Sequence, residues 1–99
     1  MLFAVVERAD GAGSIISITG EIDLASIGEF RSALRRVPES HSMIIDLAGV
    51  DFLDSLGVGV LLGARRRRRE RGLTLRVVSC DDRIAEMLDA MGVLGLLTT

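Results

Sequence analysis

The hydrophobic pattern of this chain changes period several times, and those changes limit the fold more strongly than any other feature of the sequence. A repeat of two residues is typical of a strand, and a repeat of about 3.6 is typical of a helix. Strand-like patterns occupy residues 2–8, 14–19, 43–47 and 73–78. Helix-like patterns follow the last three of these, from Leu24 to Val37, from Ser55 to Arg71, and from Asp81 or Asp82 to Met91. The predicted order is therefore β-β-α-β-α-β-α.

The connections between these segments predict how the strands pair. Asp10, Gly11 and Gly13 form a short turn cluster, which favours an antiparallel hairpin of the first two strands. The later strands are joined through helices, and such crossovers imply parallel pairing with right-handed connections. We therefore expect an α/β fold, a small mixed sheet covered by helices, in a single domain over residues 1–99.

Apolar faces and stop signals define the predicted helices. The first has an apolar face that comprises Leu24, Ile27, Phe30, Leu34 and Val37. The third has one that comprises Ile84, Met87, Leu88 and Met91. Pro38 ends the first helix, and Gly72 and Gly92 end the second and third. We expect residues 93–97 to form a short apolar tail.

Several chemistries are excluded by what the chain lacks. It contains no lysine, one histidine (His41) and one cysteine (Cys80) among its 99 residues. A phosphate-loop lysine and a Schiff-base lysine are therefore absent, and one cysteine with one histidine is too few for structural zinc. No disulfide can form within the chain, which suits a reducing compartment, and we expect Cys80 to be a buried, inert thiol.

Charge and hydropathy limit the partners. A net charge of −2 does not suit a nucleic-acid binder. No apolar stretch approaches the roughly 20 residues that a membrane span needs, and no secretory signal is visible at the N-terminus. We therefore expect a cytoplasmic protein that binds neither nucleic acid nor membrane directly.

Two polar segments follow the second and third strands, at the edge where functional loops of parallel sheets gather. They are residues 20–23, Gly-Glu-Ile-Asp, and residues 50–57, Val-Asp-Phe-Leu-Asp-Ser-Leu-Gly, and both are predicted as loops. If the two strands are adjacent and parallel, one edge of the sheet gathers Asp23, Asp51, Asp54 and Ser55.

Ser55 has two interpretations at this edge. Asp54 or Ser55 is expected to cap the second helix, as Asp23 is the first, because short oxygen-bearing side chains accept hydrogen bonds from free amides there. Alternatively, the positive end of the helix dipole makes Ser55 a position that tolerates a phosphate. A magnesium site formed by the three aspartates is a weaker alternative. A Ser-His-Asp triad is not expected, because His41 lies at the other end of the third strand.

The second predicted helix contains two further unusual features. Gly57 and Gly59 each cost up to ~1 kcal/mol inside a helix, so they either let the helix pack closely on the sheet or leave room for a partner's backbone. The run from Arg65 to Arg69 wraps around the helix and forms no single flat face. It is interpreted as a solvated end matched to the helix dipole, as a docking patch for an acidic protein, or, least well, as a nucleic-acid site.

Three motifs carry a family resemblance across nearly the whole chain. They are Gly20-Glu21-Ile22-Asp23, then Asp46-Leu47 followed by Val50, and Asp54-Ser55-Leu56-Gly57-Val58-Gly59-Val60-Leu61-Leu62-Gly63. In addition, Met91-Gly92-Val93 resembles the family's glycine after the third helix. Together with the β-β-α-β-α-β-α order, these residues resemble the STAS-domain anti-sigma-factor antagonists of bacteria.

The resemblance implies a binding switch and not an enzyme. In the family, the serine of the Asp-Ser-x-Gly motif is phosphorylated by a partner that is both an anti-sigma factor and a GHKL-type serine kinase. The matching phosphoacceptor is Ser55. The resemblance implies that the partner-binding residues are Asp23, Asp54, Ser55, Leu56, Gly57 and Gly59. Leu56 departs from the family, which often has a small or hydroxyl residue there, and it either adds apolar contact or alters kinase recognition.

The resemblance also implies a cycle. The unphosphorylated chain binds the anti-sigma factor and releases the sigma factor, phosphorylation prevents that binding, and a PP2C-like phosphatase restores it. The kinase brings the ATP, so we expect no cofactor or metal in this chain. Three alternatives remain: a STAS subunit of a membrane transporter or phospholipid-trafficking complex, an unphosphorylated scaffold in a signalling assembly, and an enzyme or nucleotide-binding domain that uses the loop carboxylates.

Overall fold

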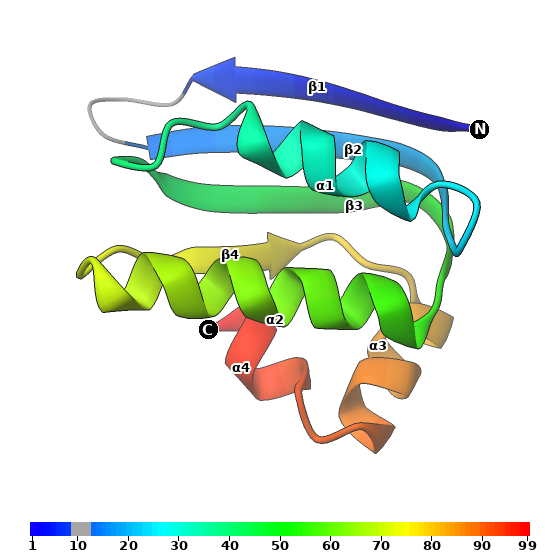
Figure 1. Ribbon diagram of the computed structural model, residues 1–99. Helices are drawn as coiled ribbons and strands as arrows, with labels where there is room; N and C mark the ends of the chain where they lie inside the picture. Colours follow the sequence, from blue (N-terminus) through cyan, green and yellow to red (C-terminus); the bar gives the residue numbers. More distant parts are fainter. Residues whose placement is uncertain (9–12) are drawn as a thin grey trace.

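The computed structural model describes residues 1–8 and 13–99 (Figure 1). The strands are β1 (Leu2–Arg8), β2 (Gly13–Ile22), β3 (Ser42–Leu53) and β4 (Leu75–Val78). The helices are α1 (Ile27–Arg35), α2 (Ser55–Glu70), α3 (Asp82–Ala90) and α4 (Leu94–Thr98). Of the predicted turn cluster, Asp10 and Gly11 lie outside the described residues, and Gly13 begins β2.

The four strands form one sheet in the order β1-β2-β3-β4, so each strand pairs with its neighbour in the sequence. β1 and β2 are antiparallel, from Leu2 opposite Gly20 to Arg8 opposite Ser14. β3 is parallel to both β2 and β4, as the helical crossovers predict. The mixed α/β sheet is therefore confirmed.

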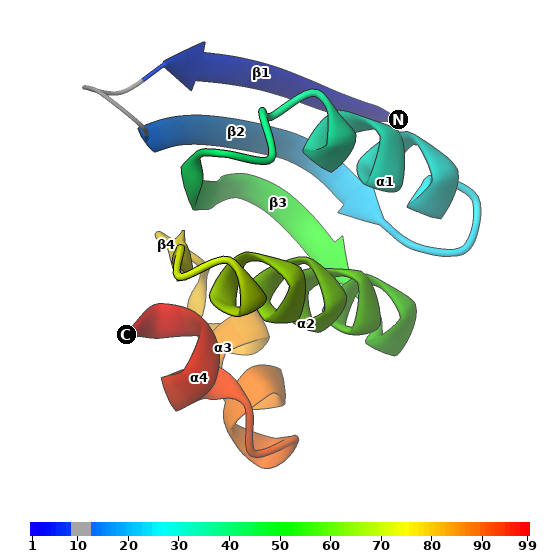
Figure 2. The same ribbon diagram turned by 60° about the vertical axis from the view of Figure 1, so that its left-hand side comes forward.

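Helices α1 and α2 cover one face of the sheet, side by side and with both N-termini at the same end of the molecule (Figure 1, Figure 2). The core between sheet and helices includes Ile16, Ile18, Ile45, Leu47, Phe30, Val58 and Leu61, all at most 1% exposed. Helices α3 and α4 lie on the β4 side, where α4 packs against β4. Buried and partly exposed residues alternate along β2 and the first part of β3, and this alternation explains why both strands could be recognised from the sequence.

Both segments predicted as loops belong largely to strands. β2 continues beyond residue 19 to Ile22, and β3 continues beyond residue 47 to Leu53. The pairing crosses two irregularities in register, at each of which β3 carries one more residue than β2. Gly20 accommodates the distortion with a φ of +107°, and an added Cβ there would overlap the carbonyl group of Met1. Such bulges interrupt the alternation by which a strand is recognised, so the predicted strand ends were wrong.

The start of α1 and the end of the chain also differ from the prediction. Helix α1 begins at Ile27 and not at Leu24, which is 75% exposed and does not belong to the apolar face. The predicted apolar tail folds instead as α4, and its Leu97 is fully buried. Met91 is 43% exposed because α3 has ended before it. Cys80, expected to be buried, is half-buried and packs against the core.

Helix α2 agrees with its prediction, with Arg71 as its C-terminal cap and Gly72 beyond it at a φ of +74°. The arginine run wraps around the helix as expected: Arg66, Arg67 and Arg69 are exposed, whereas Arg68 is buried.

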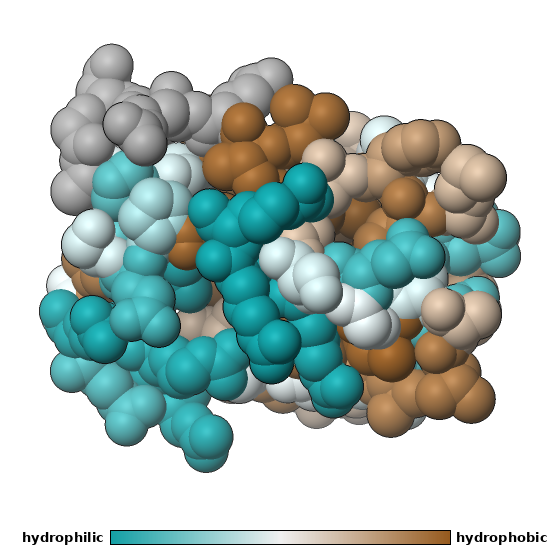
Figure 3. Space-filling model, turned by 45° about the horizontal axis from the view of Figure 1, so that its top comes forward, coloured by the Kyte–Doolittle hydropathy of each residue, from teal (hydrophilic) through white to brown (hydrophobic). Residues whose placement is uncertain are grey.

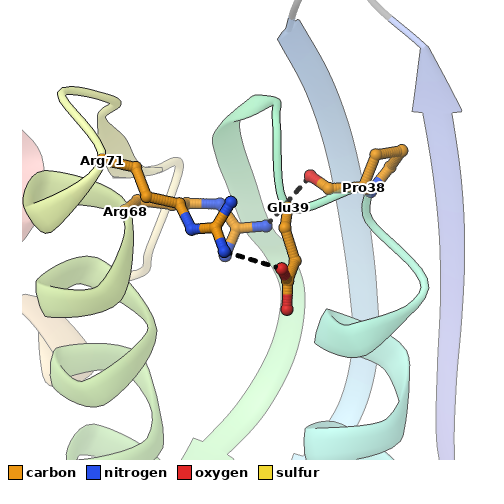
Figure 4. Close-up of polar contacts among 4 residues, drawn as sticks. All are labelled: Pro38, Glu39, Arg68 and Arg71. Atoms are coloured by element: carbon orange, nitrogen blue, oxygen red, sulfur yellow. Dashed lines mark hydrogen bonds and ion pairs between the residues drawn. The ribbon is translucent and has the colours of Figure 1, made fainter.

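The side chain of Arg68 links the end of α2 to the connection between α1 and β3 through hydrogen bonds (Figure 4). Its Nε donates to the carbonyl oxygen of His41 at 3.1 Å, and its Nη2 donates to that of Pro38 at 3.5 Å. Burial, together with the nearby charge of Arg67, lowers the pKa of the Arg68 guanidinium. One arginine of the run therefore has a structural role that its sequence context did not reveal.

Candidate functional site

The carboxyl ends of β2 and β3 lie next to each other at one edge of the sheet. Ile22 pairs with Leu53 in the parallel register, and the N–H of Asp54 donates to the carbonyl oxygen of Ile22 at 3.2 Å. Asp23 and Asp54 follow these two residues directly and therefore lie at adjacent positions. Ser55 comes next and begins α2. The structure thus brings Asp23, Asp54 and Ser55 together.

Asp54, and not Ser55, caps helix α2. Its Oδ1 accepts a hydrogen bond from the N–H of Gly57 at 3.1 Å. Ser55 is exposed, and its hydroxyl forms no hydrogen bond with any residue that the structure describes. Because capping explains Asp54 alone, the hydroxyl of Ser55 is left available to another molecule.

Asp23 lies in a tight turn before α1 and is not the cap of that helix, which is Ser26. Asp23 Oδ1 accepts from the N–H of Ser26 at 3.1 Å, and Ser26 Oγ accepts from the N–H of Asp23 at 3.0 Å. Ser26 Oγ also donates to the carbonyl oxygen of Glu21 at 2.6 Å. This reciprocal pattern holds Asp23 in place at the end of β2. The signal for Ser26 was its position three residues after an aspartate, a spacing typical of such turns.

The glycines of α2 divide into two kinds. An added Cβ at Gly57 would approach Leu53 Cδ1 to 2.5 Å and Ile22 Cγ2 to 2.6 Å, so this glycine lets the helix pack on the sheet. An added Cβ at Gly59 would have no heavy atom within 4 Å. The close-packing interpretation therefore holds for Gly57 and fails for Gly59.

Leu24 (75%), Phe52 (49%) and Leu56 (45%) are large apolar side chains that are exposed at this end of the molecule. They come from the turn before α1, the end of β3 and the first turn of α2. Figure 3 shows apolar side chains over the right-hand part and the top centre of the visible face, and hydrophilic ones over its centre and its lower left, where α2 ends. The name serine edge is used below for Asp23, Leu24, Phe52, Asp54, Ser55 and Leu56.

Leu24 and Phe52 were not anticipated as surface residues of this edge. Leu24 fits the apolar repeat of α1, and only the turn built on Ser26 excludes it from the helix. Phe52 lay in a segment predicted as a loop. Its signal was its place beside Leu53, since neighbouring residues in a strand point to opposite faces.

In the described part of the chain, the serine edge contains neither a metal-binding cluster nor a Ser-His-Asp triad. Asp51 lies in β3 and is exposed. Among residues 1–8 and 13–99, no three histidine, cysteine, aspartate or glutamate side chains are placed so as to hold a metal ion. His41 precedes β3 whereas Ser55 follows it, and His41 Nδ1 shares a hydrogen bond of 2.7 Å with Ser14 Oγ. A Ser-His-Asp triad at Ser55 is therefore excluded.

No helix in the described part of the chain is long and apolar enough to cross a membrane.

Comparison with known proteins identifies similar chains. The family model of the STAS domain matches residues 4–99. The anti-sigma-F factor antagonist RsfA of Mycobacterium tuberculosis is 30% identical over 95 residues, which cover 92% of this chain and 73% of RsfA. An anti-sigma factor antagonist from Mycobacterium paratuberculosis has a similar structure, with a TM-score of 0.79 at 24% identity over 98% of this chain and 83% of that chain. The Bacillus cell fate determinant SpoIIAA in its phosphorylated form has a TM-score of 0.73 at 19% identity over 98% of this chain and 89% of SpoIIAA.

Proposed function

Because this chain belongs to the STAS domain family, we propose that it is an anti-sigma-factor antagonist switched by phosphorylation of Ser55. Its relative RsfA is named an anti-sigma-F factor antagonist, and SpoIIAA, which shares the fold, has been solved in a phosphorylated form. In the proposed cycle the unphosphorylated chain binds an anti-sigma factor that is also a GHKL-type serine kinase, and the sigma factor is released. The cycle takes place in the cytoplasm.

The observation that carries this proposal is the free hydroxyl of Ser55. It stands on the first residue of α2, exposed to solvent, while the neighbouring Asp54 performs the capping. A kinase can reach such a hydroxyl without disturbing the helix. The exposed side chains of Leu24 and Leu56 supply apolar contact area at the same end of the molecule, as a protein interface requires.

Neither the phosphorylation of Ser55 nor its reversal requires a catalytic group from this chain. Ser55 Oγ forms the bond to the γ-phosphorus of the ATP that the kinase carries, the bond from that phosphorus to the bridging oxygen breaks, and ADP leaves. The hydroxyl proton passes to a base on the kinase. In the reverse direction, a PP2C-like phosphatase directs a water molecule at the phosphorus, and inorganic phosphate leaves with the serine hydroxyl restored.

The switch follows from charge. A phosphate adds about −1.5 to −2 charges beside the carboxylates of Asp23 and Asp54. A pair of charges ~5 Å apart contributes roughly 1–3 kcal/mol between water-like and surface-like dielectric, and burying a dianion without a counter-charge costs more. We expect the affinity for the anti-sigma factor to fall by about ten- to several-hundred-fold. The N-terminus of α2 tolerates the phosphate, so the fold is retained.

The alternative of a transporter or phospholipid-trafficking subunit is supported less well. RsfA, which matches most of this chain, is named for antagonism of an anti-sigma factor. A silent scaffold leaves the exposed and unbonded hydroxyl of Ser55 without a role.

The test uses the full chain, candidate kinase–anti-sigma factors and ATP, with mass spectrometry for the modified residue and calorimetry for the affinity. Ser55→Ala should bind the partner and resist phosphorylation, whereas Ser55→Asp should bind more weakly. Ser32→Asp, at an exposed serine of α1, is the matched control and should bind as the wild type does. Equal affinity of the phosphorylated and unphosphorylated chains would refute the switch.

A further inference from the structure

A groove of about 1060 Å³ runs between α1 and α2, and nothing in the proposed phosphorylation switch uses its length. The α2 side of the groove presents residues spaced four apart, namely Ser55, Gly59, Gly63, Arg67 and Arg71. This spacing places them in one row on the helix surface. With a rise of ~1.5 Å per residue the row is roughly 24 Å long. The groove therefore begins at the serine edge and extends to the opposite end of α2.

The groove is strongly basic in a chain that is acidic overall. Its charged lining consists of Arg31, Arg35, Arg67, Arg68 and Arg71 with Glu39 and Glu70. Five positive and two negative groups give a local charge of +3, against −2 for the whole chain. An acidic partner would therefore be attracted to this groove and repelled by much of the remaining surface.

Some of these arginines already have partners and others do not. Arg68 donates hydrogen bonds to two main-chain carbonyl oxygens, and Arg71 Nη2 forms an ion pair with Glu39 Oε2 at 3.0 Å (Figure 4). Arg31, Arg35 and Arg67 are exposed and form no ion pair with any described residue. Three unpaired guanidinium groups thus stand on the two walls of one groove.

The middle of the groove is open because of two glycines. An added Cβ at Gly59 meets nothing within 4 Å, and one at Gly63 meets only Arg67 Nη1 at 3.4 Å. Both positions disfavour the helix relative to alanine, and packing within the chain compensates for neither. Around them the lining is apolar, with Leu34, Leu56, Val60 and Ala64.

We propose that this groove binds an acidic, amphipathic segment of a partner protein. The carboxylates of that segment pair with Arg31, Arg35 and Arg67, and its apolar side chains lie over Gly59 and Gly63. Charges spread along two helices fit a chain of carboxylates better than they fit one compact anion. The net charge of −2 and the absence of aromatic residues from the groove disfavour a nucleic acid. The groove shares Ser55, Leu56 and Gly59 with the proposed switch and extends beyond them along α2, and the binding proposed here is that of the unphosphorylated chain.

The probe for this site is a fluorescein-labelled amphipathic helical peptide of about 16 residues, a length that matches the row on α2. It carries leucine on one face and glutamate on the other, and a second peptide carries glutamine in place of every glutamate. Fluorescence anisotropy with the full chain should show binding of the glutamate peptide that weakens as salt screens the ion pairs.

Two pairs of charge reversals locate the binding. Arg31→Glu with Arg67→Glu should weaken it by about tenfold or more, because several ion pairs change from attraction to repulsion. Arg36→Glu with Arg66→Glu changes the net charge equally, at the C-terminal cap of α1 and within α2, but neither residue lines the groove. That control pair should leave affinity within about threefold of the wild type. Gly63→Leu, which fills the groove without altering charge, should also abolish binding while the circular dichroism spectrum stays native.

Three results would overturn the proposal. If the two pairs of charge reversals reduced the affinity for the peptide equally, the peptide would be attracted by the net charge of the chain alone and not by the groove. Equal affinity for the glutamine peptide would remove the role of the carboxylates. Displacement of the glutamate peptide by stoichiometric tripolyphosphate would identify a site for small anions instead.

Discussion

Replacing Gly57 and Gly59 by alanine, one at a time, should have different effects on stability although the two residues lie only two positions apart in α2. Both replacements remove a glycine from a helix, which is worth up to about 1 kcal/mol in favour of the folded state. At Gly59 nothing opposes this gain, because the added methyl group has no neighbour within 4 Å. We therefore expect Gly59→Ala to raise the free energy of unfolding by about 0.5–1 kcal/mol.

At Gly57 the same gain is opposed by steric overlap between the added methyl group and the side chains beneath the helix. The added methyl group would lie 2.5 Å from Leu53 Cδ1 and 2.6 Å from Ile22 Cγ2, both in buried residues. The Ile22 methyl group branches directly from Cβ, and because Ile22 is fully buried and β-branched its χ1 rotation is restricted, so the methyl group has little room to move. Forcing an extra methyl group into a packed core costs about 1–3 kcal/mol. Since the helix term is common to the two variants, that overlap is the expected difference between them.

Thermal and urea unfolding monitored by circular dichroism measure both effects. For a domain of this size 1 kcal/mol shifts the Tm by about 4–8 °C, so a difference of 1–3 kcal/mol is easily resolved. Gly59→Ala should melt above the wild type and Gly57→Ala at or below it. Equal stabilisation by the two replacements would refute the packing assigned to Gly57.

Two further predictions concern other parts of the fold. Arg68→Ala should lower the free energy of unfolding by about 1–3 kcal/mol, because two main-chain carbonyl groups lose a charged donor, whereas Arg69→Ala should change it by less than about 0.5 kcal/mol in the same urea titration. The hydrogen bond from the Ile84 N–H holds the pKa of Asp81 below its ordinary value of about 3.8, so its stabilising contribution is present above that value and is lost as the pH falls through the lowered pKa. The difference in Tm between the wild type and Asp81→Asn should therefore shrink below about pH 3.8, and a constant difference would contradict the assignment.

The sequence predicted the order of strands and helices because most elements bury one face and expose the other. This worked for α2 and α3, whose limits follow from an aspartate cap at one end and a glycine beyond the other. It failed where β3 has extra residues relative to β2, because a bulge shifts the alternation without ending the strand. The prediction also failed at Leu24, because the hydrogen bonds of Ser26 hold this segment in a turn and the helix begins only at Ile27.

The sequence predicted which polar residues meet at this edge, but it predicted neither the exposed apolar side chains of Leu24 and Phe52 nor the division of roles among the polar residues. Parallel pairing of β2 and β3 was enough to bring Asp23, Asp54 and Ser55 to one edge. Which of Asp54 and Ser55 caps the helix depends on the backbone at the junction, since both residues have suitable side chains. The different roles of Gly57 and Gly59 depend on which side of α2 faces the sheet, which the glycines themselves do not encode.

The agreement between strand order and sequence order has a consequence for how the chain folds. No strand has to be inserted between two that are already paired, so the sheet can grow by successive addition at one side. β1 and β2 form the hairpin, β3 joins after α1, and β4 joins after α2. A ribosome that releases the chain from its N-terminus supplies the strands in this same order. The serine edge, formed by the ends of β2 and β3 and the start of α2, can therefore assemble before β4, α3 and α4 are in place.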